Sequence, residues 1–216
     1  MDERNDCTLI ETARAALLRL ERSDEREAAA RMLSIWGQEA LAEGRGEQAV
    51  ACFRVLAEYA TDTEGASSPT TMVWRGFLGR ALTEMRCYAD AEAALGDLLV
   101  DRERELGPSH ELTLVTRGNL ERATALGGRV DEGLLMAHRL LHDRLRLLGP
   151  DHPSTLDSRG HIAHFTLLAG RPVEAAELYE QLLEDRLRIL EPDDPVIDQT
   201  RYNLSAALER ADFGAH

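Results

Sequence analysis

Two pairs of histidines have the spacing at which imidazole groups on one helix face can share a metal ion. His138 and His142 are four residues apart, and His161 and His164 are three residues apart. Helical residues at these separations are neighbours on the helix surface, and neutral imidazole is a common metal ligand. Neither pair is accompanied by a carboxylate motif that would complete a coordination shell. We therefore expect no metal site.

Two further patterns resemble motifs of enzymes but lack a required part. His110-Glu111 begins a zinc-protease pattern, but Leu114 occupies the place of the second histidine. The segment Gly44 to Ala49 has the glycine spacing of a dinucleotide-binding loop, which must follow a β-strand, whereas here it joins two predicted helices. All 25 basic residues are arginine, which excludes a P-loop lysine, a Schiff-base lysine and a Ser-Lys dyad. The sequence thus predicts a protein that is not an enzyme and has no cofactor.

A row of residues that can carry positive charge recurs together with a row of glycines. The charged row is Arg80, Arg122 and His164, and each member comes four residues after a glycine, at Gly76, Gly118 and Gly160. On one face of consecutive helices these residues would form a groove floor beside a cationic row, which attracts an anionic partner. In the alternative interpretation, the arginines pair with acids of an adjacent repeat, such as Glu84 or Asp157, and the glycines allow neighbouring helices to approach closely.

Composition restricts the partner and the compartment. The chain has 216 residues and a net charge of −14, which argues against binding to nucleic acids or anionic lipids. Three cysteines, with no CxxC pair, argue against a disulfide framework or a cysteine-rich zinc site. The polar segment Met1 to Asp6 has no signal-peptide character, and no run of 18 apolar residues is present. We expect a cytoplasmic protein with no nucleic-acid or membrane partner.

An internal repeat of 42 residues positions these side chains. Gly107 to Leu148 and Gly149 to Leu190 align without a gap, and the register extends back to Gly65 to Leu106 and, in degenerate form, to Ser23 to Glu64. The recurring charged residues are Arg75, Arg117, Arg159 and Arg201, together with Asp101-Arg102, Asp143-Arg144 and Asp185-Arg186. Because a residue present in every repeat usually serves the stacking of repeats, we expect ion pairs and hydrogen bonds between repeats.

Each repeat is predicted to contain two helices. The first begins at a capping residue followed by proline, as at Ser68, His152 and Asp194, because proline has no N–H to leave unpaired in the first turn. Glycine ends the first helix at Gly44, Gly128 and Gly170, where a left-handed backbone favours it. Neither helix can bury its apolar stripe alone, so neighbouring pairs must stack into a solenoid.

The predicted domain organisation is one repeat domain with a helical cap at each end. An N-terminal capping helix lies within residues 1–22, mainly Thr8 to Leu20. The repeats are 23–64, 65–106, 107–148 and 149–190, and a final unpaired helix covers 195–212. The segment Thr61 to Ser68 is the expected hinge, and Trp36 and Trp74 are expected in the core. The fold class is therefore all-α, with about ten helices.

These residues resemble the tetratricopeptide repeat. Its Gly-x-Ala-x-x-Ala pattern is partly kept at Gly37, Ala40, Gly44, Ala49 and Phe53. The 42-residue length, the segment GPDHPSTL at Gly149 to Leu156 and the D-R-x-R-x-L helix end are similar to the kinesin light chain variety, which is abundant in actinobacteria. The resemblance covers about Ala28 to Leu208. It implies a right-handed superhelix whose concave groove, lined by the first helices, holds a peptide or a partner protein without catalysis.

The chain departs from the family at the paired asparagines of the first helix, of which the first binds peptide backbone in the family. Gly76, Gly118, Gly160 and Tyr202 occupy that first position, and Asn119, His161 and Asn203 the second. The residues predicted to line the groove are Gln38, Gly76, Arg80, Glu84, Gly118, Arg122, Gly160, His164 and Tyr202. The predicted partner is a protein or peptide, and the cationic row favours an acidic one. Two alternatives are an enzyme or small-molecule binder with a pocket near His161 and His164, and a homodimer joined through the last helix.

Overall fold

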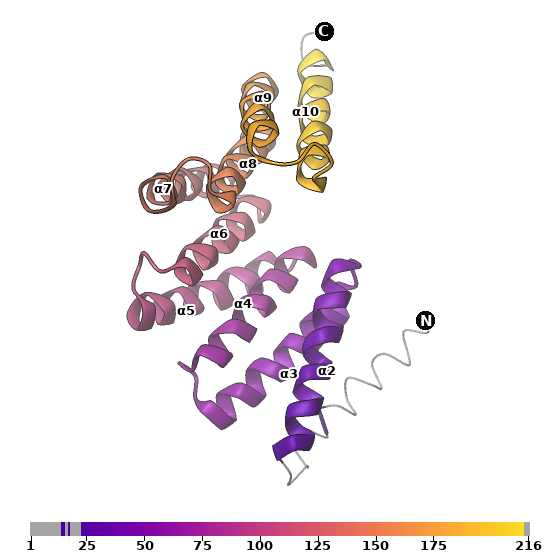
Figure 1. Cartoon of the computed structure of the whole chain (residues 1–216), viewed down its shortest axis with the longest axis vertical. Coiled ribbons are helices and arrows are strands. Elements are labelled where there is room, and N and C mark those ends of the chain that lie inside the picture. The colour runs from indigo at the N-terminus through magenta and orange to yellow at the C-terminus, as the bar shows by residue number, and fades with distance from the viewer. Residues whose placement is uncertain (1–13, 16, 18–22, 214–216) are drawn as a thin grey trace. The chain divides into compact units, whose positions relative to one another are not determined.

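A computed structural model of the chain describes residues 14, 15, 17 and 23–213. From residue 23 to residue 213 it contains nine helices and no strand (Figure 1). The helices are α2 (Ser23–Ala42), α3 (Gly46–Glu64), α4 (Pro69–Glu84), α5 (Tyr88–Leu106), α6 (Glu111–Leu126), α7 (Val130–Leu148), α8 (Pro153–Leu168), α9 (Pro172–Ile189) and α10 (Pro195–Phe213). The all-α prediction is confirmed, and the last helix extends one residue beyond its predicted end.

The chain divides into two compact units, residues 1–120 and 121–216, and the boundary falls inside α6. In the N-terminal unit α2 packs on α3, α3 on α4 and α4 on α5. In the C-terminal unit α7 packs on α8, α8 on α9, and α10 on α9 with a smaller contact to α8. Consecutive helices therefore pack as neighbours, as stacked helix pairs require.

The predicted capping helix from Thr8 to Leu20 lies mostly outside the described residues. Within it, Arg14, Ala15 and Leu17 are helical, and Leu17 is buried. Arg14 forms an ion pair with Glu58 of α3 at 3.4 Å.

The predicted boundaries of the first helices are confirmed by capping contacts. The Ser68 hydroxyl accepts a hydrogen bond from the Thr71 amide at 3.0 Å, and His152 Nδ1 accepts one from the Ser154 amide at 3.2 Å. Three of the first helices end at glycines with positive φ: α2 at Gly44 (73°), α6 at Gly128 (99°) and α8 at Gly170 (75°). In the second repeat Arg86 takes this position with φ 61°, a conformation that costs roughly 1–2 kcal/mol for a residue with a Cβ atom.

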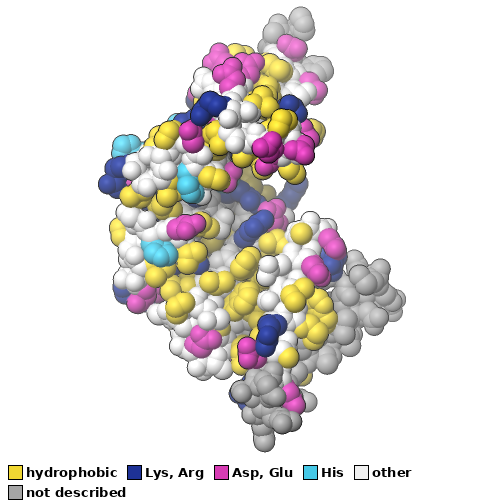
Figure 2. Space-filling model, viewed as in Figure 1, with side chains coloured by type: hydrophobic (Ala, Val, Ile, Leu, Met, Phe, Trp, Pro, Cys, Tyr) yellow, Lys and Arg dark blue, Asp and Glu magenta, His cyan; other side chains and the backbone are white. Residues whose placement is uncertain are grey.

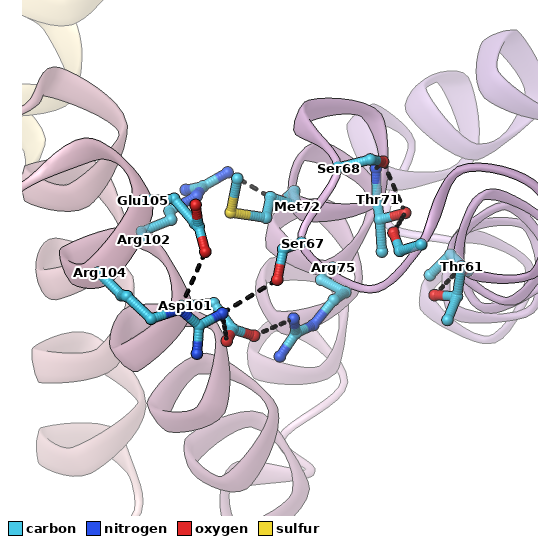
Figure 3. A network of polar contacts seen from close by, with 12 residues as sticks. Thr61, Ser67, Ser68, Thr71, Met72, Arg75, Asp101, Arg102, Arg104 and Glu105 are labelled. Carbon is cyan, nitrogen blue, oxygen red and sulfur yellow. Dashed lines mark hydrogen bonds and ion pairs between the residues drawn. The ribbon is translucent and has the colours of Figure 1, made fainter.

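Three buried arginines connect each second helix to the first helix of the following repeat (Figure 3 shows Arg102). Arg102 Nη1 donates to the Leu112 carbonyl at 2.9 Å and to the Thr116 hydroxyl at 2.6 Å, and its Nη2 donates to the Met72 carbonyl at 2.8 Å. Arg144 donates in the same way to Ser158, and Arg186 to Thr200. The predicted hydrogen bonds between repeats are confirmed at these positions.

Arg75 and Arg159, two of the other recurring arginines, pair within a repeat, which corrects the prediction of contacts between repeats at these positions. Arg75 of α4 binds Asp101 of α5 at 2.5 Å, and Asp101 also accepts a hydrogen bond from Arg104 at 3.0 Å (Figure 3). Arg159 binds Asp185 in the same manner. The first helix faces the second helix of its own pair at this position, so the guanidinium reaches the nearer carboxylate.

Aromatic side chains pack on one another in the N-terminal unit. Phe53 stacks on Trp74 with ring centroids 6.4 Å apart and on Phe77 at 5.0 Å. Trp36 and Trp74 are both half-buried. None of the described helices is long and apolar enough to cross a membrane.

Candidate functional site

The candidate site is a group of charged and titratable side chains on the first helices of the C-terminal unit. Glu121 and Arg122 come from α6, His161 and His164 from α8, and Arg210 from α10. Arg122 and His164 were predicted from the sequence, whereas Glu121 and the contribution of Arg210 were not. Helical spacing predicts that His161 and His164 share a face of α8, because they are one turn apart.

Glu121 and His161 form a hydrogen-bonded pair at the centre of this group. Glu121 Oε1 lies 2.9 Å from His161 Nδ1, and the Glu121 side chain is fully buried whereas the His161 side chain is 32% exposed. A buried carboxylate needs such a partner, because its desolvation is otherwise costly. When Nδ1–H of a neutral imidazole donates to the carboxylate, the Nε2 atom of the same ring remains a hydrogen-bond acceptor.

His164 is half-buried beside this pair. The Phe165 ring lies 5.8 Å from the His161 ring and 6.1 Å from the His164 ring, centroid to centroid. Burial lowers the pKa of His164 below its usual 6.5, and the nearby His161, Arg122 and Arg210 act in the same direction. The imidazole of His164 is therefore neutral at pH 7.

The lowered pKa of His164 predicts a loss of stability as pH falls below about 6.5. In that range the unfolded chain binds a proton at His164 that the folded chain does not, so acid favours unfolding. We expect the melting temperature of the wild-type protein to fall more between pH 7.5 and pH 5.5 than that of His164→Gln. An equal fall in both proteins, measured by circular dichroism, would contradict this assignment.

Of the other predicted groove residues, Gly160 lies on α8, Tyr202 lies on α10, and the rest lie in the N-terminal unit. Gln38, Arg80 and Glu84 are exposed on α2 and α4, and Tyr202 on α10 is 71% exposed. Gly118 is buried in α6. Figure 2 shows acidic and basic side chains interspersed on one face of the molecule, with apolar side chains between them. The assignment of all these residues to one groove stays a prediction.

Two of the recurring glycines face the second helix of their own repeat. A Cβ atom on Gly160 would lie 3.5 Å from Leu182 Cδ2, and one on Gly76 would lie 3.4 Å from Arg102 Nη2 and 3.7 Å from Leu98 Cδ2. These are ordinary van der Waals distances. A methyl group would therefore fit at Gly76 and Gly160, so close approach of the second helix does not by itself require glycine at these two positions.

We expect Gly160→Ala to raise the free energy of unfolding by up to about 1 kcal/mol, because alanine is the better helix former and its methyl group fits. Gly79→Ala is the matched control, since its Cβ would lie 2.5 Å from Leu95 Cδ2. That substitution should destabilise by about 1–3 kcal/mol through overpacking. Urea denaturation of the two variants measures both values, and a destabilising Gly160→Ala would show that this position does not tolerate a methyl group.

The remaining candidate ligands are dispersed. His138 and His142 are exposed on α7. Across the described residues, no group of three or more His, Cys, Asp or Glu side chains could hold a metal ion. Cys52 and Cys87 are free thiols, and burial raises the pKa of Cys52 to about 11, which makes it a poor nucleophile at neutral pH.

Comparisons with known proteins agree with the repeat structure. The tetratricopeptide repeat family model matches residues 71–111 and 155–196. A comparison with curated proteins found no match. The nearly identical TPR-like repeats of a chain assigned as a kinesin light chain from Podosopora anserina are 21% identical, with a TM-score of 0.65, and the match covers 84% of this chain and 86% of that one.

A second solved structure, BtubC (BKLC) from P. vanneervenii, is 15% identical, with a TM-score of 0.68, and the match covers 97% of this chain and 82% of that one. At these identities the likeness establishes the fold. Tetratricopeptide repeats are in general a fold for protein–protein interaction. Residues 71–111 and 155–196 therefore match the tetratricopeptide repeat, and the chain has a fold similar to that of kinesin light chain-like repeat proteins.

Proposed function

We propose that the chain is a non-catalytic binding module that holds an acidic peptide or an acidic segment of a partner protein. The observation that carries this proposal is that Arg122 of α6 and Arg210 of α10, together with His161, lie near enough to His164 of α8 to lower its pKa. The protein as a whole is strongly acidic, with a net charge of −14. A local cationic group on such a protein selects for anionic partners, because other surfaces repel them.

The buried arginines of the repeats differ in exposure from the residues that we assign to recognition. Arg102, Arg144 and Arg186 are at most 8% exposed and serve the packing of helix pairs. Arg122 and His164 keep part of their side chains accessible to solvent on first helices. The residues that hold the fold together are therefore distinct from those that we assign to recognition.

Binding of a blocked hexaglutamate peptide, measured by calorimetry with hexalysine as the control peptide, tests this function. We expect Arg122→Gln to weaken hexaglutamate binding several-fold, whereas Arg139→Gln, an equal charge change on exposed α7, should leave it unchanged. Binding should also weaken at high salt. Equal binding of both peptides, or no effect of Arg122→Gln, would count against acidic recognition at this site.

A second candidate function is the binding of a small molecule at the same place. The Glu121–His161 pair favours it, because a carboxylate that orients an imidazole is a common arrangement in sites that bind or deprotonate small molecules. A thermal-shift screen of small organic acids and amines, repeated with His161→Gln, tests it. A compound that stabilises only the wild-type protein would support this function.

A further inference from the structure

The third repeat exchanges small and large side chains at three register positions that the other repeats share. In those repeats the second helix carries a large residue, and its own first helix and the next first helix carry small ones. The large residues are Phe53, Leu95 and Tyr179, and the small ones are Gly37 and Ala81, Gly79 and Ala123, and Ala163 and Ala207. A Cβ on Gly79 would be 2.5 Å from Leu95 Cδ2, and Tyr179 shares a core cluster with Ala163 and Ala207. The small residues therefore make room for the large one.

In the third repeat Ala137 takes the second-helix position, and Glu121 and Phe165 take the two first-helix positions. All three are fully buried. Phe165 of α8 belongs to the same core cluster as Ala137, so its ring supplies the volume that a second-helix residue supplies elsewhere. Burying the Glu121 carboxylate costs solvation free energy that Gly or Ala would not cost, which favours a role other than stability.

The exchanged residues hold two histidines of α8 in place. Glu121 Oε1 lies 2.9 Å from His161 Nδ1, and an ionised carboxylate can only accept a hydrogen bond, so Nδ1 carries the hydrogen. The His161 ring also stacks on Phe165, and the His164 ring lies against the same phenyl ring. One edge and one face of His161 are thus covered. The 32% of its side chain that is exposed lies at the opposite edge, which carries Nε2, and on the other face.

The remaining ring nitrogens of these histidines are available to a ligand. Among the described residues, His161 is hydrogen-bonded through Nδ1 alone, and the ring of His164 makes no hydrogen bond. A neutral imidazole has one N–H donor and one acceptor nitrogen. His161 therefore offers an acceptor at Nε2, and His164 offers a donor. The two residues are one helical turn apart, which places their Cβ atoms about 5–6 Å from each other.

We infer that His161 and His164 bind the main chain of an extended segment, with His161 Nε2 accepting the N–H of one residue and the His164 ring donating to the C=O of the same residue. In an extended chain these two groups point to the same side, as they do where one residue of an antiparallel pair exchanges both hydrogen bonds with its partner. Main-chain contacts give affinity independently of the side chains. This inference rests on the proposed function and names the group of the bound segment that the histidines contact. Glu121 is then a positioning residue for His161.

Calorimetric titration of the full chain at pH 7.5 with two blocked hexamers tests the inference. The first is hexaglutamate. The second is its all-ester analogue, in which oxygen replaces every main-chain N–H while the carboxylates and main-chain carbonyl groups remain. Because both hexamers carry the same charge, electrostatic attraction does not distinguish them. The wild-type protein should bind the ester analogue about five- to tenfold more weakly, since the hydrogen bond to His161 is lost.

Two variants examine the two hydrogen bonds separately. Glu121→Ala, which introduces the residue type of Ala163, releases His161, so this variant should bind both hexamers with nearly equal affinity. His164→Leu should weaken both hexamers by the same factor, because both keep the carbonyl group, and the wild-type ratio between them should remain. Long-range ¹H–¹⁵N NMR should find the hydrogen of His161 on Nδ1 in the wild-type protein and mainly on Nε2 in Glu121→Ala. Circular dichroism verifies that both variants are folded.

The outcomes separate this inference from the function on which it rests. Equal binding of the two hexamers by the wild-type protein would overturn main-chain recognition and leave acidic recognition standing. A wild-type ratio that persists in Glu121→Ala would likewise overturn it, because a group other than the oriented His161 would then accept the N–H. Absence of binding for both hexamers would overturn the inference and the proposed function together.

Discussion

Replacing Arg102 with alanine is expected to lower the free energy of unfolding by about 3–5 kcal/mol. Arg102 is 3% exposed and its guanidinium donates to Met72, Leu112 and Thr116, so three acceptors lose a charged donor at once. A hydrogen bond to a charged group contributes about 1.5–3 kcal/mol, and a buried acceptor left without its donor adds to the loss. Chemical denaturation of the full chain measures the change.

Two variants make this prediction specific to the buried guanidinium. Arg104 lies on the same helix with 57% of its side chain exposed, and Arg104→Ala should leave the free energy of unfolding nearly unchanged. Thr116→Val keeps the shape of the acceptor and removes its hydroxyl, so it should show a fraction of the Arg102→Ala loss. Equal losses for Arg102→Ala and Arg104→Ala would mean that the hydrogen bonds of Arg102 do not stabilise the junction between repeats.

The fold could be predicted from the sequence because its signals are local and repeated. Proline after a capping residue marks the start of α4, α8 and α10, and a glycine with positive φ ends α2, α6 and α8, at Gly44, Gly128 and Gly170. Each signal depends only on a few neighbouring residues. The 42-residue period then joins the helices into pairs without any knowledge of long-range contacts.

The hydroxyl groups that accept hydrogen bonds from the buried arginines were not predicted, although their recurrence in the sequence could have indicated them. Thr116, Ser158 and Thr200 recur at the repeat period, one to each first helix. Their residue types differ and they share only a hydroxyl group, so an alignment based on identical residues does not detect them. Their partners Arg102, Arg144 and Arg186 were noticed because the residue type itself is repeated.

The centre of the candidate site was missed for a different reason. In the sequence Glu121 looks like an ordinary helical glutamate. Gly37, Gly79 and Ala163 occupy the equivalent position in the other repeats, and the structure shows that this position lies in the core. The pattern becomes visible when the second-helix partner Ala137 is considered with it. A pairwise size reversal is a relation between two helices, and reading one helix at a time does not reveal it.

Leu182→Ala is expected to destabilise the protein by about 2–5 kcal/mol, since it leaves a cavity that packed neighbours cannot fill completely. Leu182 is 1% exposed and belongs to a core cluster to which α8, α9 and α10 contribute, with Leu156, Tyr179 and Ala207 among its members. Leu187→Ala on the same helix removes a side chain that is 45% exposed, and it should change stability by no more than about 0.5 kcal/mol.

The loss of stability caused by Leu182→Ala should be greatest in the helices that neighbour Leu182. Stacked helix pairs contact only adjacent pairs, so stability is approximately a sum of local terms. Hydrogen exchange should therefore show a greater loss of protection in α8, α9 and α10 than in α3 and α4 of the N-terminal unit. A uniform loss of protection from α2 to α10 would mean instead that the two compact units unfold as one cooperative structure, and the Leu182 cavity would then weaken every repeat equally.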